Sequence, residues 1–126
     1  MAWNLDNDRP IYAQLVERLQ VQIISGAYLP GGKLPSVREL AAVAAVNPNT
    51  MQKAFAELEK SGLIITQGTN GRIVTEDEGL IQDSKRELAK RHADVYFAGM
   101  EGLGFDRSQA VSFLQDTAGK GEAGDE

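Results

Sequence analysis

Residues 36–62 read SVRELAAVAAVNPNTMQKAFAELEKSG and contain two consecutive helix-start signals. Ser36 and Glu39 have the spacing of a capping box, in which the serine hydroxyl accepts from the glutamate amide and the glutamate side chain reaches back. Asn47 and Pro48 repeat the signal, because asparagine is a favoured N-cap and proline is tolerated at the first helical position. The sequence therefore predicts a short helix to about residue 43, a tight link, and a second helix to about residue 60.

Apolar periodicity supports these two helices and predicts another one before them. Between residues 10 and 25, apolar side chains recur every four residues, with Asp8 as the expected N-cap and Gly26 as the stop. The residues expected to be buried are Ile11, Leu15, Leu19, Ile23, Val37, Leu40, Ala41, Met51, Ala54, Phe55 and Leu58. All three helices thus have one apolar face for a common core.

A β-hairpin is predicted directly after the third helix. Residues 63–67 are rich in β-branched side chains, residues 68–71 (GTNG) form a turn signal, and residues 72–75 return as a second strand. Three helices followed by a hairpin are typical of a winged helix-turn-helix. The expected fold class is mainly α with a small β-hairpin (α+β).

The rear of the chain predicts two more helices behind an acidic boundary at residues 76–78. A long helix over about residues 80–100 is followed by Asp106 and Gln109, which have capping-box spacing. Two helices cannot fully cover each other's apolar faces, so we expect a two-fold homodimer. The apolar residues expected to dimerise are Ile81, Leu88, Val95, Tyr96 and Phe97. The expected domains are residues 1–77 (winged domain), 78–117 (two-helix dimerisation region) and 118–126 (disordered tail).

Composition narrows the class of protein. The chain has no cysteine, and thus neither disulfides nor thiolate metal sites. It has no apolar run near the roughly 18 residues of a membrane span, and its start does not resemble a signal peptide, so we expect a cytoplasmic protein without membrane contact. Residues 1–75 carry seven basic and six acidic side chains, a net charge of +1, so residues 76–126 carry −6 of the total of −5. This distribution is compatible with DNA binding through one face.

The pair of helices at residues 36–43 and 47–60 is the strongest functional signal. In a helix-turn-helix the second helix enters the major groove with its N-terminal residues at the base edges. Asn and Gln can pair with adenine, and Thr can contact bases or the thymine methyl. The candidate residues are Asn47, Pro48, Asn49, Thr50, Gln52 and Lys53. The alternative is that Asn47 and Thr50 only cap a solvated surface helix.

Two arginines are candidates for contacts outside the second helix. Arg38, one turn into the first helix of the pair, could bind a phosphate, or it could form an ion pair with Glu39 or Glu57. Arg72 follows the hairpin tip and could touch a phosphate, enter the minor groove, or remain solvated.

Ordered blocks of the sequence resemble the GntR family of bacterial transcription regulators, over about residues 9–77. The blocks are PIYAQL (10–15), GAYLPG (26–31), LPSVRELA (34–41), NPNT (47–50) and LEKSGLI (58–64). The short acidic rear resembles the YtrA subfamily. The resemblance implies DNA contacts by Ser36, Arg38, Asn47, Asn49, Thr50, Gln52 and the wing tip (Thr69, Asn70, Gly71, Arg72), and dimerisation by the rear helices. Two departures are Gln52, where many members carry Arg, and the wing, where the usual Gly-x-Gly is altered.

These observations predict a sequence-specific transcription regulator, a repressor rather than an activator, whose dimer occupies double-stranded DNA at an inverted-repeat operator. The alternative is a winged-helix protein-interaction module without DNA binding. No phosphate loop, serine elbow or metal cluster is present in the sequence, so we expect no enzyme, cofactor or metal site, and we interpret the lone His92 as solvated. A small-molecule effector stays unknown, and about 50 rear residues leave little room for a large pocket.

Overall fold

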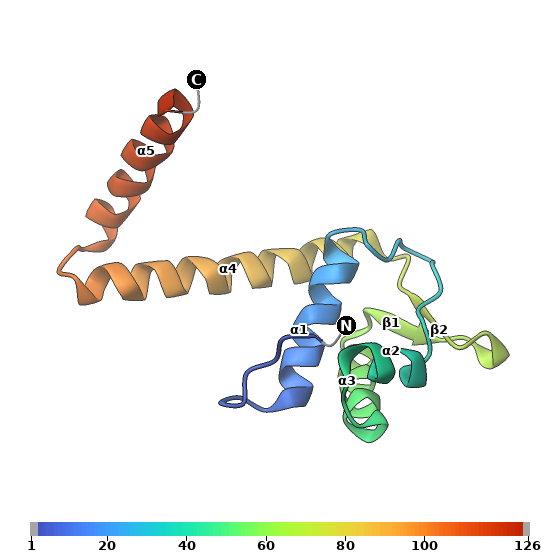
Figure 1. Cartoon of the computed structure of the whole chain (residues 1–126). Helices are drawn as coiled ribbons and strands as arrows, with labels where there is room; N and C mark the ends of the chain where they lie inside the picture. The colour runs from blue at the N-terminus through green and yellow to red at the C-terminus, as the bar shows by residue number, and fades with distance from the viewer. Residues whose placement is uncertain (1–2, 125–126) are drawn as a thin grey trace. The chain divides into compact units, whose positions relative to one another are not determined.

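The computed structural model describes residues 3–124, without the side chains of residue 70 and residues 120–124. Three described helices precede a two-stranded antiparallel hairpin and two further helices follow it (Figure 1), so the predicted fold class is confirmed. The elements are α1 (Ile11–Ile24), α2 (Val37–Ala44), α3 (Pro48–Ser61), β1 (Ile64–Thr66), the 3-10 turn η1 (Gly68–Asn70), β2 (Arg72–Val74), α4 (Glu78–Gly102) and α5 (Arg107–Gly124).

The core of the winged domain lies where α1 and α2 pack against α3. Leu15, Leu19 and Ile23 recur every four residues on α1, and each is at most 2% exposed. The predicted apolar residues of α2 and α3 belong to the same buried cluster: Leu40, Ala41, Met51, Ala54, Phe55 and Leu58. Each large side chain buried in this way stabilises the domain by about 1.5–3 kcal/mol. α3 is thus the central helix of this core, and α1 and α2 both pack against it.

The predicted caps of α2 and α3 are confirmed. The Glu39 amide donates to Ser36 Oγ at 3.0 Å, and the Ser36 amide donates to Glu39 Oε1 at 3.0 Å. At the start of α3, Asn47 Oδ1 accepts from the Asn49 amide at 2.7 Å. The helix ends at Gly62, whose φ of +88° is the left-handed conformation that favours glycine.

The predicted cap of α1 is wrong. The helix begins at Ile11 with Pro10 in the N-cap position, where no side-chain hydrogen bond forms, so Asp8 does not cap it. Proline disfavours helical geometry in the residue before it, here Arg9. The helix therefore starts after Pro10, at Ile11. The segment before α1 is instead fastened by Gln14, as described below.

The link between α2 and α3 contains a left-handed alanine. Ala45 has φ +60° and ψ +48°, and it is the non-glycine residue with positive φ in the described backbone. Its amide donates to the Ala42 oxygen at 3.2 Å, and the Val46 amide donates to the Ala41 oxygen at 3.0 Å. These bonds close the end of α2 and turn the chain into α3.

The hairpin, which is the wing, is shorter than predicted. β1 and β2 pair with Ile64 opposite Val74 and Thr66 opposite Arg72, so the ends expected to extend to residues 63, 67 and 75 fall outside the ladder. The other edge of β2 is occupied by the segment before α2, because the Leu34 amide donates to the Arg72 oxygen at 2.9 Å. The wing extends away from the three helices (Figure 1).

The chain divides into two compact units, Met1–Lys85 and Arg86–Glu126. The expected boundary after residue 77 lies at the start of α4, where Asp77 Oδ1 accepts from the Leu80 amide at 3.1 Å. The first turn of α4 belongs to the first unit because Ile81 lies in the core of that unit. Leu80 also packs closely on Gly62, where an added Cβ would lie 3.0 Å from Leu80 Cδ2. Ile81 is 7% exposed, so we withdraw it from the expected dimer contacts.

Within the second unit, the start of α5 is built as predicted. The Gln109 amide donates to Asp106 Oδ1 at 2.8 Å, and the Asp106 amide donates to Gln109 Oε1 at 2.9 Å. Phe105 packs against Phe113, with ring centroids 6.1 Å apart. The helix continues to Gly124, so residues 118–124, expected as tail, extend α5, while residues 125–126 lie outside the described residues. Gly119, Gly121 and Gly124 disfavour a helix, yet α5 continues through them, since extending a helix costs less than nucleating one.

Candidate nucleic-acid interface

The first turns of α3 present polar side chains to solvent. Asn47, Asn49, Gln52 and Lys53 are exposed, and Thr50 is half-buried. Pro48, also exposed, occupies the first helical position. The opposite face of the same helix is buried, so the core orients this polar face outward. Asn47 uses its carboxamide oxygen to cap the helix, as the alternative interpretation holds for this residue. The side chains of Asn49 and Gln52 take no part in the cap.

Lys53 lies on the side of α3 that faces α1. Its ammonium group stands 3.9 Å from the centroid of the Tyr12 ring, close enough for a cation–π interaction. The ring holds the charge near the seam between the two helices, at an exposed position. The sequence predicted this lysine as a surface residue of α3 and could not foresee its aromatic partner.

The start of α2 carries Ser36 and Arg38. Ser36 is exposed and serves in the capping box, so its hydroxyl already accepts one hydrogen bond. Arg38 is exposed, and the alternative ion pairs with Glu39 or Glu57 are not among those formed by the described residues. The guanidinium of Arg38, in the first turn of α2, is thus open to a ligand.

The capping box lowers the pKa of the Glu39 carboxyl group. Hydrogen bonds from the Ser36 amide and then the Ser36 hydroxyl lower the pKa of its carboxyl group, and the Lys33 charge lowers it further. The capping box therefore places a negative charge at the N-terminal end of α2, where the helix dipole favours it.

The wing tip is exposed at Thr69 and Gly71. The side chain of Asn70, a predicted contact residue, lies outside the described residues. Arg72 is not simply solvated, because its Nε lies 3.2 Å from Glu59 Oε1 and its guanidinium stands 5.2 Å from the centroid of the Phe55 ring. Arg72 thus points toward α3 and is half-buried there.

A cavity of about 230 Å³ brings the start of α2 and the wing together. Ser36 and Glu39 line one side, and Thr69, Gly71 and Arg72 line the other. Lys33, which the sequence analysis did not single out, lies at the same cavity and is exposed. A basic residue three positions before a capping serine is a weak signal, so Lys33 could be found only once the hairpin was placed beside it.

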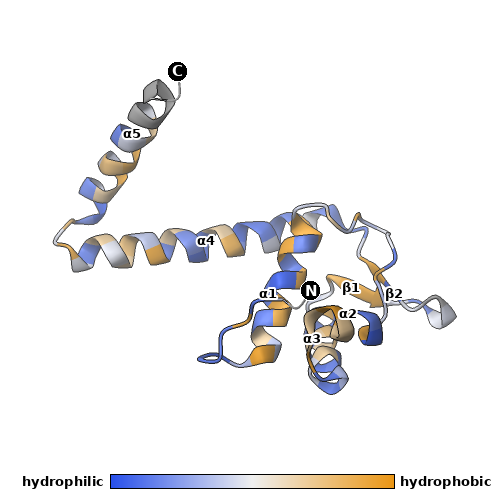
Figure 2. Cartoon of the chain, viewed as in Figure 1, coloured by the Kyte–Doolittle hydropathy of each residue, from blue (hydrophilic) through white to orange (hydrophobic). Residues whose placement is uncertain are grey.

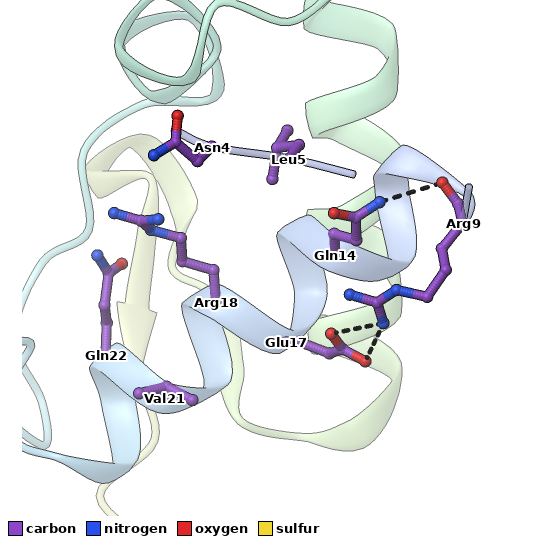
Figure 3. Close-up of a pocket in the computed structure, with 8 residues that line it drawn as sticks. All are labelled: Asn4, Leu5, Arg9, Gln14, Glu17, Arg18, Val21 and Gln22. Atoms are coloured by element: carbon purple, nitrogen blue, oxygen red, sulfur yellow. Dashed lines mark hydrogen bonds and ion pairs between the residues drawn. The ribbon is translucent and has the colours of Figure 1, made fainter. Parts of the chain in front are cut away.

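Gln14 fastens the segment before α1. Its side chain is buried at 6% exposure, accepts from the Asp6 amide at 2.7 Å, and donates to the Asp6 and Arg9 oxygens at 2.8 and 3.1 Å. Figure 3 shows the bond to Arg9, whose guanidinium also pairs with Glu17 at 3.2 Å. The fastened segment forms one wall of an open cleft of about 480 Å³ along α1.

The fastened segment also reaches the helix-turn-helix. Trp3 and Leu5 pack against the core, and with Asn7 they line a second cavity of about 370 Å³ whose other wall includes Asn47 and Thr50. Gln14 therefore supports the start of α3 through the segment it holds. Sequence reasoning missed this role, because a lone glutamine on a helix is ordinarily solvated.

The remaining predicted residues lie in the second unit. Val95 is 73% exposed and Leu88 is half-buried. Tyr96 donates from its hydroxyl to the Ala110 oxygen at 2.7 Å, and the Arg107 guanidinium lies 4.2 Å from the centroid of the Phe97 ring. These two aromatic residues thus join α4 to α5 within one chain. His92 is exposed, and the described residues contain no cluster of metal-ligating side chains.

The chain is similar in sequence and in structure to known bacterial transcription regulators. The profile described as "Bacterial regulatory proteins, gntR family" matches residues 11–74, which are α1 through β2. The chain belongs to the GntR family. It is therefore a transcription regulator whose winged helix-turn-helix is the DNA-binding domain, as the sequence predicted. Among the described helices, none is both long and apolar enough to cross a membrane.

Three relatives illustrate the match of this GntR-family chain. The HTH-type transcriptional repressor YtrA of Bacillus subtilis is 39% identical over 98 residues, covering 73% of this chain and 75% of YtrA. A GntR family transcriptional regulator from Listeria monocytogenes has a TM-score of 0.81 at 36% identity, over 89% of this chain and 98% of that one. The DNA-binding domain of AraR, solved in complex with the operator ORX1, has a TM-score of 0.51 at 30% identity, over 60% of this chain and 92% of the domain.

Proposed function

We propose that the chain is a sequence-specific repressor that occupies an inverted-repeat operator as a homodimer in the cytoplasm. The observation that carries the proposal is the exposed polar start of α3, held by the Asn47 cap and by a buried apolar face. A rigid helix end with amide and hydroxyl side chains is suited to the major groove.

Base reading is assigned to Asn49, Thr50 and Gln52. The carboxamides of Asn49 and Gln52 are exposed and can each form two hydrogen bonds with adenine, while Thr50 can contact a base or the thymine methyl. Asn47 and Pro48 set the position of the helix end, and Lys53 lies farther along the same exposed side. Glutamine in place of arginine at position 52 favours adenine over guanine at the contacted base.

Phosphate binding is assigned to the start of α2 and to the wing. Arg38 and Lys33 are exposed cations on either side of the Ser36 cap, and neither joins an ion pair among the described residues. Thr69, Asn70 and Gly71 form the tip of the wing, which can follow the neighbouring minor groove. Phosphate contacts of this kind set the register of the protein on DNA without reading sequence.

Dimerisation is assigned to the second unit. Among residues 86–119, whose side chains are described, the buried apolar ones are Met100 and Ala110, whereas Val95 is 73% exposed and Leu103 is 74% exposed. Apolar residues recur along α5 (Figure 2), and Phe113 and Leu114 are also among the exposed ones. A second copy would cover these surfaces, and two-fold symmetry would set two copies of α3 against the halves of an inverted repeat.

The proposed mechanism is occlusion, in which the dimer occupies an operator that overlaps a promoter. YtrA is named a repressor, and the AraR domain was solved on an operator, which supports the same role here. The proposal involves no catalytic step and no cofactor. An effector that adjusts DNA binding would have to use a small cleft such as the one along α1.

The test begins with selection of a preferred duplex from a random pool by the full-length chain, followed by titration of that duplex and of random DNA. Asn49→Ala and Thr50→Ala should each reduce the discrimination between the two by roughly 1–3 kcal/mol, the value of one good base contact. Gln82→Ala, which removes an exposed amide from α4, is the control and should leave discrimination unchanged.

Two outcomes would contradict the proposal. Equal losses on selected and random DNA would mean that α3 does not read bases. Failure to enrich any duplex, or binding that does not weaken as salt rises, would favour the protein-interaction module, because binding to DNA releases counterions.

A further inference from the structure

The carboxylate of Glu59 connects α3 to both strands of the wing. Glu59 lies near the end of α3, and its Oε1 is 3.2 Å from Arg72 Nε on β2. Its Oε2 accepts from the hydroxyl of Thr66 on β1. Thr66 and Arg72 are directly opposite each other in the hairpin ladder. One side chain of the recognition helix therefore binds one cross-strand pair of the wing.

Arg72 is held by more than its charge. The guanidinium stands 5.2 Å from the centroid of the Phe55 ring, and Phe55 is fully buried in α3. The side chains of Arg72 and Glu59 are 24% and 30% exposed, so water screens this pair less than an exposed one. A charge-assisted bond with an aromatic neighbour gives the guanidinium a fixed direction toward α3.

The wing needs such an attachment because its hairpin is small. Each strand has three residues, and an isolated two-stranded hairpin is marginally stable at best. Backbone bonds join β2 to the segment before α2, but β1 has no backbone partner other than β2 among the described strands. Ile64 and Val74 anchor the base of the hairpin in the core. The Glu59 carboxylate ties the next pair toward the tip, Thr66 and Arg72, to the recognition helix.

We propose that Glu59, Thr66 and Arg72 form a clasp that fixes the angle between the recognition helix and the wing. Arg72 is then a positioning residue for the wing, and its guanidinium is not the DNA contact that its place after the hairpin tip suggests. The clasp lets α3 and the wing contact adjacent grooves with the hairpin already ordered. A hairpin that had to become ordered during binding would reduce the affinity. This inference rests on the proposed DNA-binding function.

The decisive variant is Glu59→Gln, because a purely electrostatic role and a positioning role predict changes in DNA affinity of opposite sign. Removal of a negative charge beside DNA should strengthen binding if the charge acts only through the field. Loss of the clasp should instead weaken binding to the selected duplex, by roughly three- to thirtyfold for residues coupled by direct contact. Glu57→Gln, an exposed acid on the same helix, is the matched control and should leave affinity unchanged or slightly raised.

Arg72→Gln separates the clasp from a phosphate contact. The clasp predicts weaker binding with an unchanged salt dependence, and a double variant with Glu59→Gln that is no weaker than either single variant. Exchange of the charges, Glu59→Arg with Arg72→Glu, should recover most of the lost affinity. Hydrogen exchange at residues 64–74 of the free chain should accelerate in both single variants and not in Glu57→Gln.

Several results would overturn the clasp. One is a salt slope that falls by about one unit in Arg72→Gln while Glu59→Gln binds normally, which would make Arg72 a phosphate contact. Another is unchanged hydrogen exchange in the wing. Should a charge variant fail to fold, Thr66→Val removes only the hydroxyl bond, and normal exchange and affinity in that variant would equally refute the clasp. The exchange measurement needs no DNA, so it tests the clasp even if the chain selects no duplex.

Discussion

Arg38 extends from the first turn of α2 as an exposed guanidinium, outside the ion pairs of the described residues. If it binds a phosphate, Arg38→Ala should weaken binding to all duplexes alike and lower the slope of log K against log salt by about one unit. Titration of the full-length chain at several salt concentrations measures this slope. Lys60→Ala, which removes an exposed cation from the far end of α3, should leave the slope in place, and a slope unchanged in Arg38→Ala would exclude the phosphate contact.

Ala45 affects the stability of the domain through its left-handed backbone conformation. The left-handed conformation costs a non-glycine residue roughly 1–2 kcal/mol, and glycine loses about 0.4–1 kcal/mol of stability through the unfolded chain. Because Ala45 is exposed, Ala45→Gly removes little packing and should stabilise the domain by about 0.5–1 kcal/mol.

Urea unfolding measures this gain, and the neighbouring helix provides its control. Ala42 is exposed within α2, where glycine should destabilise by roughly 0.5–1 kcal/mol. Equal losses in the two glycine variants would show that the conformation of Ala45 is not strained.

Among the elements, α2 depends most visibly on its cap. Ser36 and Glu39 exchange two hydrogen bonds, and the bond that the Ser36 amide donates to the Glu39 carboxylate is the main cause that lowers the pKa of this carboxyl group. A carboxyl group whose pKa is lower in the folded state stabilises the fold above its unfolded pKa, about 4.3 for glutamate, and loses that effect as pH falls through the folded value.

The stability difference between the wild-type chain and Glu39→Gln should therefore be constant near neutral pH and shrink below about pH 4.3. Urea midpoints measured from pH 7 to pH 3 follow this difference. The Gln82→Ala variant, which changes no ionisable group, should show no such trend relative to the wild type. A difference for Glu39→Gln that stays constant down to pH 3 would mean that the capping box does not hold the ionised form.

The helix caps and strand ends differ in how well the sequence predicts them. The caps of α2, α3 and α5 were predicted because each links residues two or three positions apart, within one turn of helix. The cap at Asp8 was wrong because Pro10 delayed the start of α1 to Ile11. The strands came out shorter than predicted, since strand ends depend on the partner strand and not on β-branched residues alone.

For the whole molecule, the main prediction concerns assembly. Val95 is 73% exposed in a single chain, so Val95→Asp should leave the fold of that chain intact. If Val95 is buried between two copies, the unpartnered carboxylate should split the dimer. Sedimentation of the full-length chain at micromolar concentration should give a dimer, and the variant a monomer.

Ala93→Asp is the matched control, because Ala93 is exposed on α4 about 200° away around the helix. It should remain a dimer. A monomeric wild-type chain, or a dimer that tolerates Val95→Asp as well as Ala93→Asp, would remove this face from the interface. The monomeric variant should also bind the selected inverted repeat much more weakly, since the gain from linking two half-site contacts is lost.

The order of the elements, the apolar faces of α1 and α3, and the polar start of the recognition helix can be predicted from the amino-acid sequence. These follow from helical periodicity and from bonds between near neighbours, so a short stretch of chain contains all the information that they need. Three contacts could be found only from the folded chain: Arg72 with Glu59, Lys53 with Tyr12, and Ile81 with the core of the first unit. Each of these contacts joins side chains from different elements, and their meeting depends on how the helices and the hairpin pack rather than on any local pattern.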